Sequence, residues 1–202
     1  MIPLSDGTLL FVGAAFRDDC VHRETDLASG IYRAVLHADG TWTRPVPFRF
    51  PPEAKGLAFY EPHGVQLPGG RIVAVFRAQT PDGRVFTVWQ SVSDDGGTTF
   101  SEPRPLGVEG SPPHLMVHSS GALVLSYGRR KPPFGIRARI SLDSGETYGE
   151  EIVLRDDGLD PDIGYPSTTE LRDGALLTVY YYRESYGIPG SDILYTKWRI
   201  DA

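Results

Sequence analysis

Cysteine, lysine and methionine are scarce in this chain of 202 residues, and long apolar runs are absent. The one cysteine, Cys20, excludes an internal disulfide. No stretch of about 18 apolar residues occurs, so we expect no membrane-spanning helix. No basic segment followed by an apolar core opens the chain, so no signal peptide is visible and the compartment stays open. The net charge of −6 argues against a general nucleic-acid-binding surface.

Turn-forming and aromatic residues are abundant instead. The chain has 23 Gly and 17 Pro, and Phe, Trp and Tyr together make up 11% of it. Gly and Pro mark turns, whereas aromatic residues favour strands. Short apolar segments alternate with these turns, and no long amphipathic helix is apparent. The sequence therefore predicts an all-β fold.

Two segments share an unusual pattern, Ser-x-Asp-x-Gly-x-Thr-aromatic. They occupy residues 93–100 and 141–148, and their aspartates Asp95 and Asp143 lie 48 positions apart. Asp and Ser side chains bond amides within their own turn, and Gly allows the positive φ of a tight hairpin. Repetition at this period predicts the blades of a β-propeller. The motif thus indicates the fold and does not hold the chemistry.

Four repeats emerge when the chain is aligned on its hairpin glycines, Gly7, Gly70, Gly121 and Gly174. We predict one domain over residues 1–202, a propeller of the six-bladed type with about four blades near 1–50, 57–107, 111–155 and 162–202. The first repeat begins almost at its turn and the last stops after its third strand. We therefore expect the C-terminal part of a longer protein or a gene start placed late. Unclosed blade edges would favour self-association.

Residues that open the first strand of a blade face the channel of a propeller, which is where a ligand would bind. Glu61, Pro112 and Tyr165 are equivalent, because each stands nine residues before its hairpin glycine. The same count makes His63, His114 and Ser167 equivalent. Arginines stand near the ends of the second strands or before the second turn motif: Arg77, Arg129, Arg130, Arg183, Arg137 and Arg139.

These residue types suggest recognition of an acidic sugar. Arginine binds carboxylates through two parallel hydrogen bonds. A tyrosine beside a carboxylate can act as a nucleophile, because the carboxylate takes the phenolic proton. Structural roles are the alternative for each residue. Tyr165 would then be a packed aromatic, Glu61 a solvated loop residue and Arg77 a cover for apolar surface.

The chain resembles the Asp-box (BNR-repeat) sialidase superfamily over nearly its whole length, and within it a sialidase-like branch of exo-glycosidases. The resemblance rests on the two turn motifs, on the segment SYGRRKPPFGIRA at residues 126–138 and on DIGYPS at residues 162–167. It implies a six-bladed propeller, three arginines that bind the sugar carboxylate, a tyrosine nucleophile paired with a glutamate, and an aspartate acid/base.

Individual residues carry these implied roles. Tyr165 is similar in position to the nucleophile and Glu61 to its glutamate. Arg77 and Arg137 are similar to the second and third arginines. No Arg-Ile-Pro segment supplies the first arginine, and Asp18, Asp19 and Asp26 are candidates for the acid/base only because they lie near a first-blade loop. The predicted site comprises two catalytic residues, Tyr165 and Glu61, and five substrate-binding residues, Arg77, Arg137, Arg130, His63 and His114.

Three hypotheses for function remain at this point. The first is a glycoside hydrolase that releases a terminal acidic sugar, most simply sialic acid. The second is a non-catalytic propeller that binds a glycan or a protein, which the missing arginine and aspartate favour. The third is an inactive fragment of a longer sialidase-like protein. We expect a sugar or glycan as partner and no cofactor, and two histidines alone do not predict a metal site.

Overall fold

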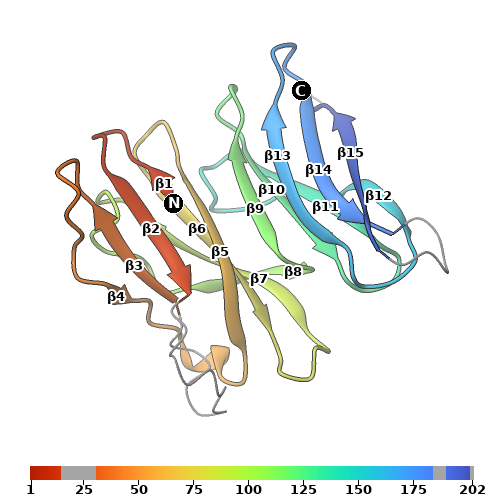
Figure 1. Ribbon diagram of the computed structural model, residues 1–202, viewed down its shortest axis with the longest axis horizontal. Coiled ribbons are helices and arrows are strands. Elements are labelled where there is room, and N and C mark those ends of the chain that lie inside the picture. The colour runs from red at the N-terminus through yellow and green to blue at the C-terminus, as the bar shows by residue number, and fades with distance from the viewer. Residues whose placement is uncertain (15–30, 184–189, 201–202) are drawn as a thin grey trace. The chain divides into compact units, whose positions relative to one another are not determined.

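The computed structural model describes residues 1–14, 31–183 and 190–200, and within them nearly all regular structure is strand (Figure 1). One short 3-10 helix, Pro52–Ala54, is the exception. In the described part of the chain, no helix has the length and apolar character needed to cross a membrane. The all-β prediction is confirmed.

Within the described residues, the strands form four separate antiparallel sheets, each a meander of strands consecutive in sequence. The first sheet contains β1 (Ile2–Pro3), β2 (Leu9–Ala14), β3 (Ile31–Leu36) and β4 (Val46–Pro47). The second contains β5 (Ala58–Gln66), β6 (Ile72–Gln79), β7 (Phe86–Ser93) and β8 (Arg104–Glu109). The third contains β9 (Pro113–Val117), β10 (Leu123–Arg129), β11 (Phe134–Ser141) and β12 (Ile152–Gly158). The fourth has three strands, β13 (Gly164–Glu170), β14 (Leu176–Tyr182) and β15 (Asp192–Trp198).

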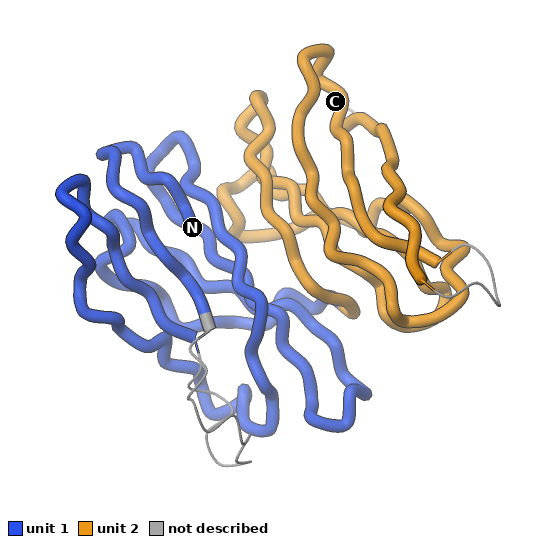
Figure 2. Tube along the Cα trace, in the orientation of Figure 1, with its two compact units in different colours: residues 1–108 blue, residues 109–202 orange. Residues whose placement is uncertain are grey.

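The chain divides into two compact units, residues 1–108 and 109–202 (Figure 2). The core of the first unit includes Leu10, Ile31, Ile72 and Phe76, all fully buried. Aromatic rings also contribute to it, with Phe50 stacked on Phe59 at 3.9 Å between centroids. A core cluster in the second unit joins Ile136 and Ile163 to Tyr180 and Tyr182. The single domain predicted for the whole chain stays a prediction.

The same hairpin turn joins the first two strands of every sheet. In the second sheet the amide of Leu67 donates to the carbonyl of Arg71, and the amide of Gly70 donates to the carbonyl of Leu67. The equivalent bonds recur at Leu4, His118 and Leu171, and also at His37 between β3 and β4. Each turn holds a glycine at φ between 73° and 90°, which side chains disfavour. Local sequence therefore sets the register of each hairpin.

The two Ser-x-Asp-x-Gly-x-Thr turns have matching geometry. Asp95 accepts hydrogen bonds from the hydroxyl of Ser93 at 2.8 Å and from the amide of Thr99 at 2.9 Å. Asp143 accepts from Ser141 and Thr147 at the same two distances. The threonine hydroxyl of each turn also donates to the aspartate. The bonds from the threonine hydroxyl and amide lower the pKa of each carboxyl to about 2. The turns follow β7 and β11, and they close the sheet at the end where the first hairpin also lies.

Candidate functional site

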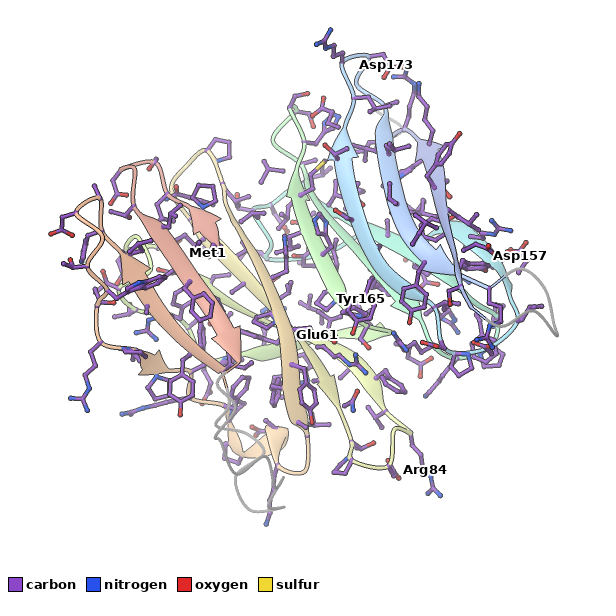
Figure 3. All side chains as sticks on the ribbon, viewed as in Figure 1. Met1, Glu61, Arg84, Asp157, Tyr165 and Asp173 are labelled. Carbon is purple, nitrogen blue, oxygen red and sulfur yellow. The ribbon has the colours of Figure 1, made fainter. Side chains whose placement is uncertain are left out.

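Glu61 and Tyr165 share a backbone conformation that few residues adopt. Their φ angles are +45° and +48°, and among described non-glycine residues only Ser144 also has a positive φ. A proline follows each, and the register of β5 with β6 and of β13 with β14 shifts at these points. Figure 3 shows the two side chains on β5 and β13. Left-handed backbone at such residues costs about 1–3 kcal/mol and is concentrated at functional sites.

Glu61 forms an ion pair with Arg77 on the neighbouring strand. The Arg77 Nη1 donates to Glu61 Oε2 at 2.9 Å, while Nε and Nη2 donate to Gln79 Oε1 at 2.9 and 2.6 Å. The guanidinium also lies 5.6 Å from the centre of the Phe86 ring. These contacts use three of the five N–H groups of Arg77 and leave two for a ligand. The sequence-predicted residues Glu61 and Arg77 therefore lie together.

Tyr165 lies beside a second tyrosine. Its ring centre is 5.8 Å from that of Tyr181 on β14, and its own side chain is 50% exposed. The Tyr181 hydroxyl donates to Asp162 at 2.6 Å and accepts a long bond of 3.4 Å from Arg130. Burial, followed by the bond to Asp162, raises the pKa of Tyr181. Tyr181 is thus held neutral and fixed, whereas Tyr165 is half exposed.

Arg77 and Tyr181 occupy equivalent positions, which the sequence analysis missed. Each lies seven residues after its hairpin glycine (70 + 7 and 174 + 7), and each contacts the residue nine before that glycine. The signal was present, because counting forward as well as backward from the glycine would have found Tyr181. Gly128 holds this position in the third sheet, opposite Pro112. A Cβ on Gly128 would lie 3.0 Å from the Cα of Gly164, so a side chain there would require the neighbouring backbone to shift.

Arg130 and His114 contribute to the second unit, where both were predicted to bind substrate. Arg130 donates to the carbonyls of Ser111 and Pro161, each at 3.1 Å, in addition to its bond with Tyr181. His114 Nδ1 accepts from the amide of Thr168 at 3.4 Å. Arg130 thus ties the segment before β13 to the end of β10, close to Tyr165. A sugar-binding role for either residue stays a prediction.

His63 follows Glu61 on β5 in the first unit. Burial lowers its pKa to about 4, so the ring is neutral at physiological pH. A neutral imidazole offers one hydrogen-bond donor and one acceptor rather than a positive charge. Its predicted contact with a sugar would therefore be a hydrogen bond to a hydroxyl.

Arg137 is buried and bonded to residues of its own unit. The side chain is only 2% exposed, and its Nε donates to Glu151 at 3.1 Å. Its remaining bonds go to the carbonyls of Ile136, Arg155 and Pro133. Glu151 also accepts from the hydroxyl of buried Tyr127 at 2.7 Å. These bonds give Arg137 a structural role between β11 and β12, and its role in substrate binding stays a prediction.

Several expected residues cannot be placed. Asp18, Asp19, Asp26 and Cys20 lie outside the described residues. Within the described ranges, no group of three or more His, Cys, Asp or Glu side chains is arranged to hold a metal ion.

Comparison with known proteins identifies the fold. The BNR repeat-like domain matches residues 41–178. A protein of unknown function from Dyadobacter fermentans superposes with a TM-score of 0.81 at 29% identity, over 98% of this chain and 52% of that one. The Hadza microbial sialidase Hz136 superposes with a TM-score of 0.69 at 15% identity, over 96% of this chain and 43% of that one. No curated protein matches the sequence.

An α-L-arabinanase from Penicillium chrysogenum, solved with arabinobiose, is also similar. Its TM-score is 0.70 at 17% identity, over 96% of this chain and 60% of that one. The chain therefore spans about half of the length of these neighbours. Its four meander sheets and their likeness to these proteins confirm the fold class, a partial β-propeller.

Proposed function

Because this chain belongs to the BNR repeat-like domain family, we propose that it is part of a glycoside hydrolase that releases a terminal acidic sugar. One observation carries the proposal. Glu61 and Tyr165 stand at equivalent places in their sheets, both in left-handed backbone, and each contacts a partner seven residues beyond the hairpin glycine. Packing alone does not call for a carboxylate and an exposed phenol at such costly positions.

The chemistry assigned to these residues is a displacement at the anomeric carbon. In the proposed step the Tyr165 oxygen attacks that carbon and the bond to the leaving oxygen breaks. Glu61 is the proposed acceptor of the phenolic proton, and the leaving oxygen takes up a proton from water. A phenol suits an anionic sugar because, unlike a carboxylate, it does not repel the substrate's negative charge. Sialidases are the glycosidases that use a tyrosine nucleophile. Water then releases the sugar from Tyr165.

Arg77 is the proposed carboxylate-binding group. It retains two N–H groups after its bonds with Glu61 and Gln79, and its side chain is 15% exposed. Gln79 fixes the plane of the guanidinium through two bonds to one oxygen. That orientation would let the free edge of the fork meet a substrate carboxylate.

A neutral pentofuranoside is the second candidate substrate. The Arg137 side chain is 2% exposed and four of its five N–H groups bond neighbouring residues of the second unit, which favours a substrate without a carboxylate. Similar structures include an arabinanase and an α-L-arabinofuranosidase from Fusarium graminearum, both solved with arabinobiose. An α-L-arabinofuranose end group needs no arginine clamp.

Hydrolysis of two fluorogenic substrates by the full-length protein separates the candidates. We expect turnover of a 4-methylumbelliferyl sialoside and at least about a 10²-fold loss of it in Tyr165→Phe. Tyr195→Phe is the matched control, because Tyr195 is 70% exposed on β15 of the same sheet. The second substrate is a 4-methylumbelliferyl α-L-arabinofuranoside. Turnover of this substrate and not of the sialoside would favour the neutral pentofuranoside. Equal rates in Tyr165→Phe and wild type would refute the role of Tyr165.

A further inference from the structure

The first unit contains a pocket at the opposite end of its second sheet from Arg77. Ile72 pairs with Ser93 at one end of the β6–β7 ladder, and Gln79 pairs with Phe86 at the other, close to Arg77. The pocket is lined by Arg33 on β3, by residues 46–49 at and after β4, and by residues 99–102 at the end of the turn motif and just after it. Its volume of about 430 Å³ is within the range of small-ligand sites. It is separate from the residues assigned to catalysis.

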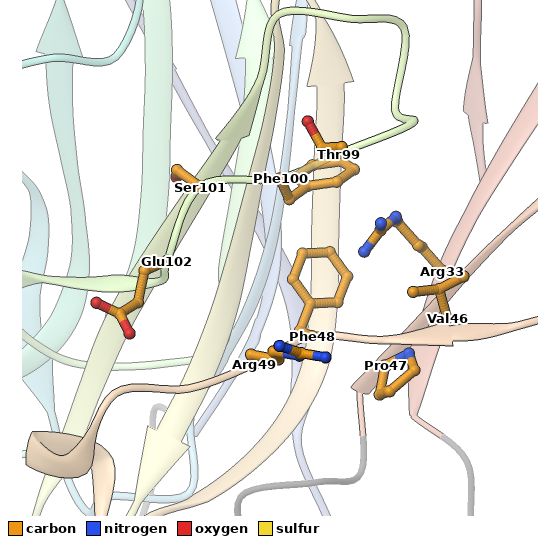
Figure 4. A pocket seen from close by; sticks show the side chains of 9 residues that line it. All are labelled: Arg33, Val46, Pro47, Phe48, Arg49, Thr99, Phe100, Ser101 and Glu102. Atoms are coloured by element: carbon orange, nitrogen blue, oxygen red, sulfur yellow. The ribbon is translucent and has the colours of Figure 1, made fainter.

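Two arginines and two phenylalanines line this pocket (Figure 4). The Arg33 guanidinium lies 5.7 Å from the centre of the Phe48 ring and 5.5 Å from that of Phe100. Its Nη2 donates to the carbonyl of Thr98 at 2.8 Å. The rings and this bond fix the guanidinium plane and leave its other N–H groups for a ligand.

Arg49 and Glu102 supply the remaining charges. Both side chains are exposed, and neither has a hydrogen bond or ion pair with any residue in the described ranges. They are therefore not paired with each other, although they line the same pocket. Asp95 is also close enough to Arg33 to raise its pKa, but burial dominates and lowers that pKa. The Asp95 oxygens are already occupied by Ser93 and Thr99.

We propose that this pocket binds a saccharide that carries a carboxylate, such as a uronic acid residue. The planar forks of Arg33 and Arg49 match a carboxylate, which accepts two parallel bonds from a guanidinium. Glu102 accepts from sugar hydroxyls, and the exposed Val46 and Pro47 supply apolar contact for the ring. The proposal does not depend on the catalytic roles of Glu61 and Tyr165.

Titration of the ¹⁵N-labelled protein with trigalacturonate tests this site, with neutral arabinotriose as the comparison ligand. We expect shifts of the Phe48, Phe100 and Glu102 amides with trigalacturonate only. Arg49→Gln should weaken binding at least about tenfold, since hydrogen bonds between charged groups are strong. Arg44→Gln is the control, because Arg44 is exposed and lies outside the pocket.

Arg49 has no structural partner among the described residues, so its substitution should leave the fold intact. Unchanged affinity in Arg49→Gln would overturn the proposal. So would equal shifts with arabinotriose, or the absence of shifts at the three pocket amides.

Discussion

Arg77 donates from Nη1 to Glu61 Oε2 at 2.9 Å, across the first two strands of the second sheet. In the fourth sheet the same two positions hold Tyr165 and Tyr181, whose rings lie 5.8 Å apart. The fold thus repeats a pair of positions. The first has left-handed backbone, and the second, on the neighbouring strand, contacts the side chain of the first. A charged pair fills them in one unit and an aromatic pair in the other. The third sheet fills them with Pro112 and Gly128, which carry no reactive group.

Gln79 is expected to act through Arg77. Its amide oxygen accepts two of the guanidinium bonds, so Gln79→Ala should free Arg77 to rotate. If Arg77 binds the substrate carboxylate, KM should rise about tenfold with a smaller change in kcat. Gln79→Glu keeps the guanidinium in place but adds a negative charge that repels the substrate carboxylate, so it should not restore the affinity. A purely structural role for Gln79 would instead lower thermal stability without changing KM.

Asp143 is expected to stabilise the fold above pH 4. Its pKa is about 2 in the folded protein and near 3.8 in the unfolded chain, so the unfolded state binds the proton first as pH falls. The stability from Asp143 is therefore present above pH 3.8 and is lost as pH falls toward 2.

Thermal unfolding of Asp143→Asn across this range checks the expectation. The variant should have a lower Tm than wild type at pH 6, and the difference should shrink between pH 4 and 2. Asp156→Asn is the control, because Asp156 is an exposed aspartate on β12 outside the turn motif. A Tm difference that stays constant down to pH 2 would contradict the assigned role.

His63 is expected to remain neutral in weak acid. Burial lowers its pKa to about 4, against about 6.5 in an unfolded chain. Between these values the unfolded state binds more protons, so wild type should lose stability relative to His63→Gln as pH falls from 6.5 to 4. An NMR titration of the imidazole measures the pKa directly. A value near 6.5 would contradict this burial.

Gly128 is expected to be required for the packing of β10 against the start of β13. An added Cβ would lie 3.0 Å from Gly164 Cα and 3.1 Å from the carbonyls of Ile163 and Ser111. Because backbone atoms cannot move aside as a side chain can, Gly128→Ala should destabilise the protein by about 1–3 kcal/mol. Urea unfolding measures this change. Gly69→Ala is the control, since a Cβ there meets nothing within 4 Å, and an equal loss in both variants would contradict the explanation.

Much of the fold could be predicted because local sequence determines it. The Asp95 and Asp143 turns and the hairpin glycines use bonds between residues at most four positions apart. The equivalence of Glu61 and Tyr165 followed from the same spacing. The left-handed backbone at Glu61 and Tyr165 could not be predicted from that spacing, because it occurs where the register of the strand pair shifts.

Side-chain partners that depend on the pairing of two strands could not be predicted. The register of β11 with β12 shifts at Ile136 and Arg137, where Arg137 bonds the carbonyl of Arg155 on β12, and sequence alone does not specify an irregular register. Tyr181 was missed although the spacing from Gly174 would have found it. It lies within Tyr180-Tyr181-Tyr182, where strand alternation buries the two outer residues and turns the middle one to the other face.

The most direct test of the catalytic account is to trap the sugar on the protein. The full-length protein would be incubated with a fluorinated sialyl fluoride, whose fluoride leaves as the nucleophile attacks and whose ring fluorine slows release. Peptide mapping by mass spectrometry would then locate the label. We expect one added sugar on the peptide that contains Tyr165, and none in Tyr165→Phe. A label on any other residue, or turnover of the sialoside with no covalent adduct, would contradict the account.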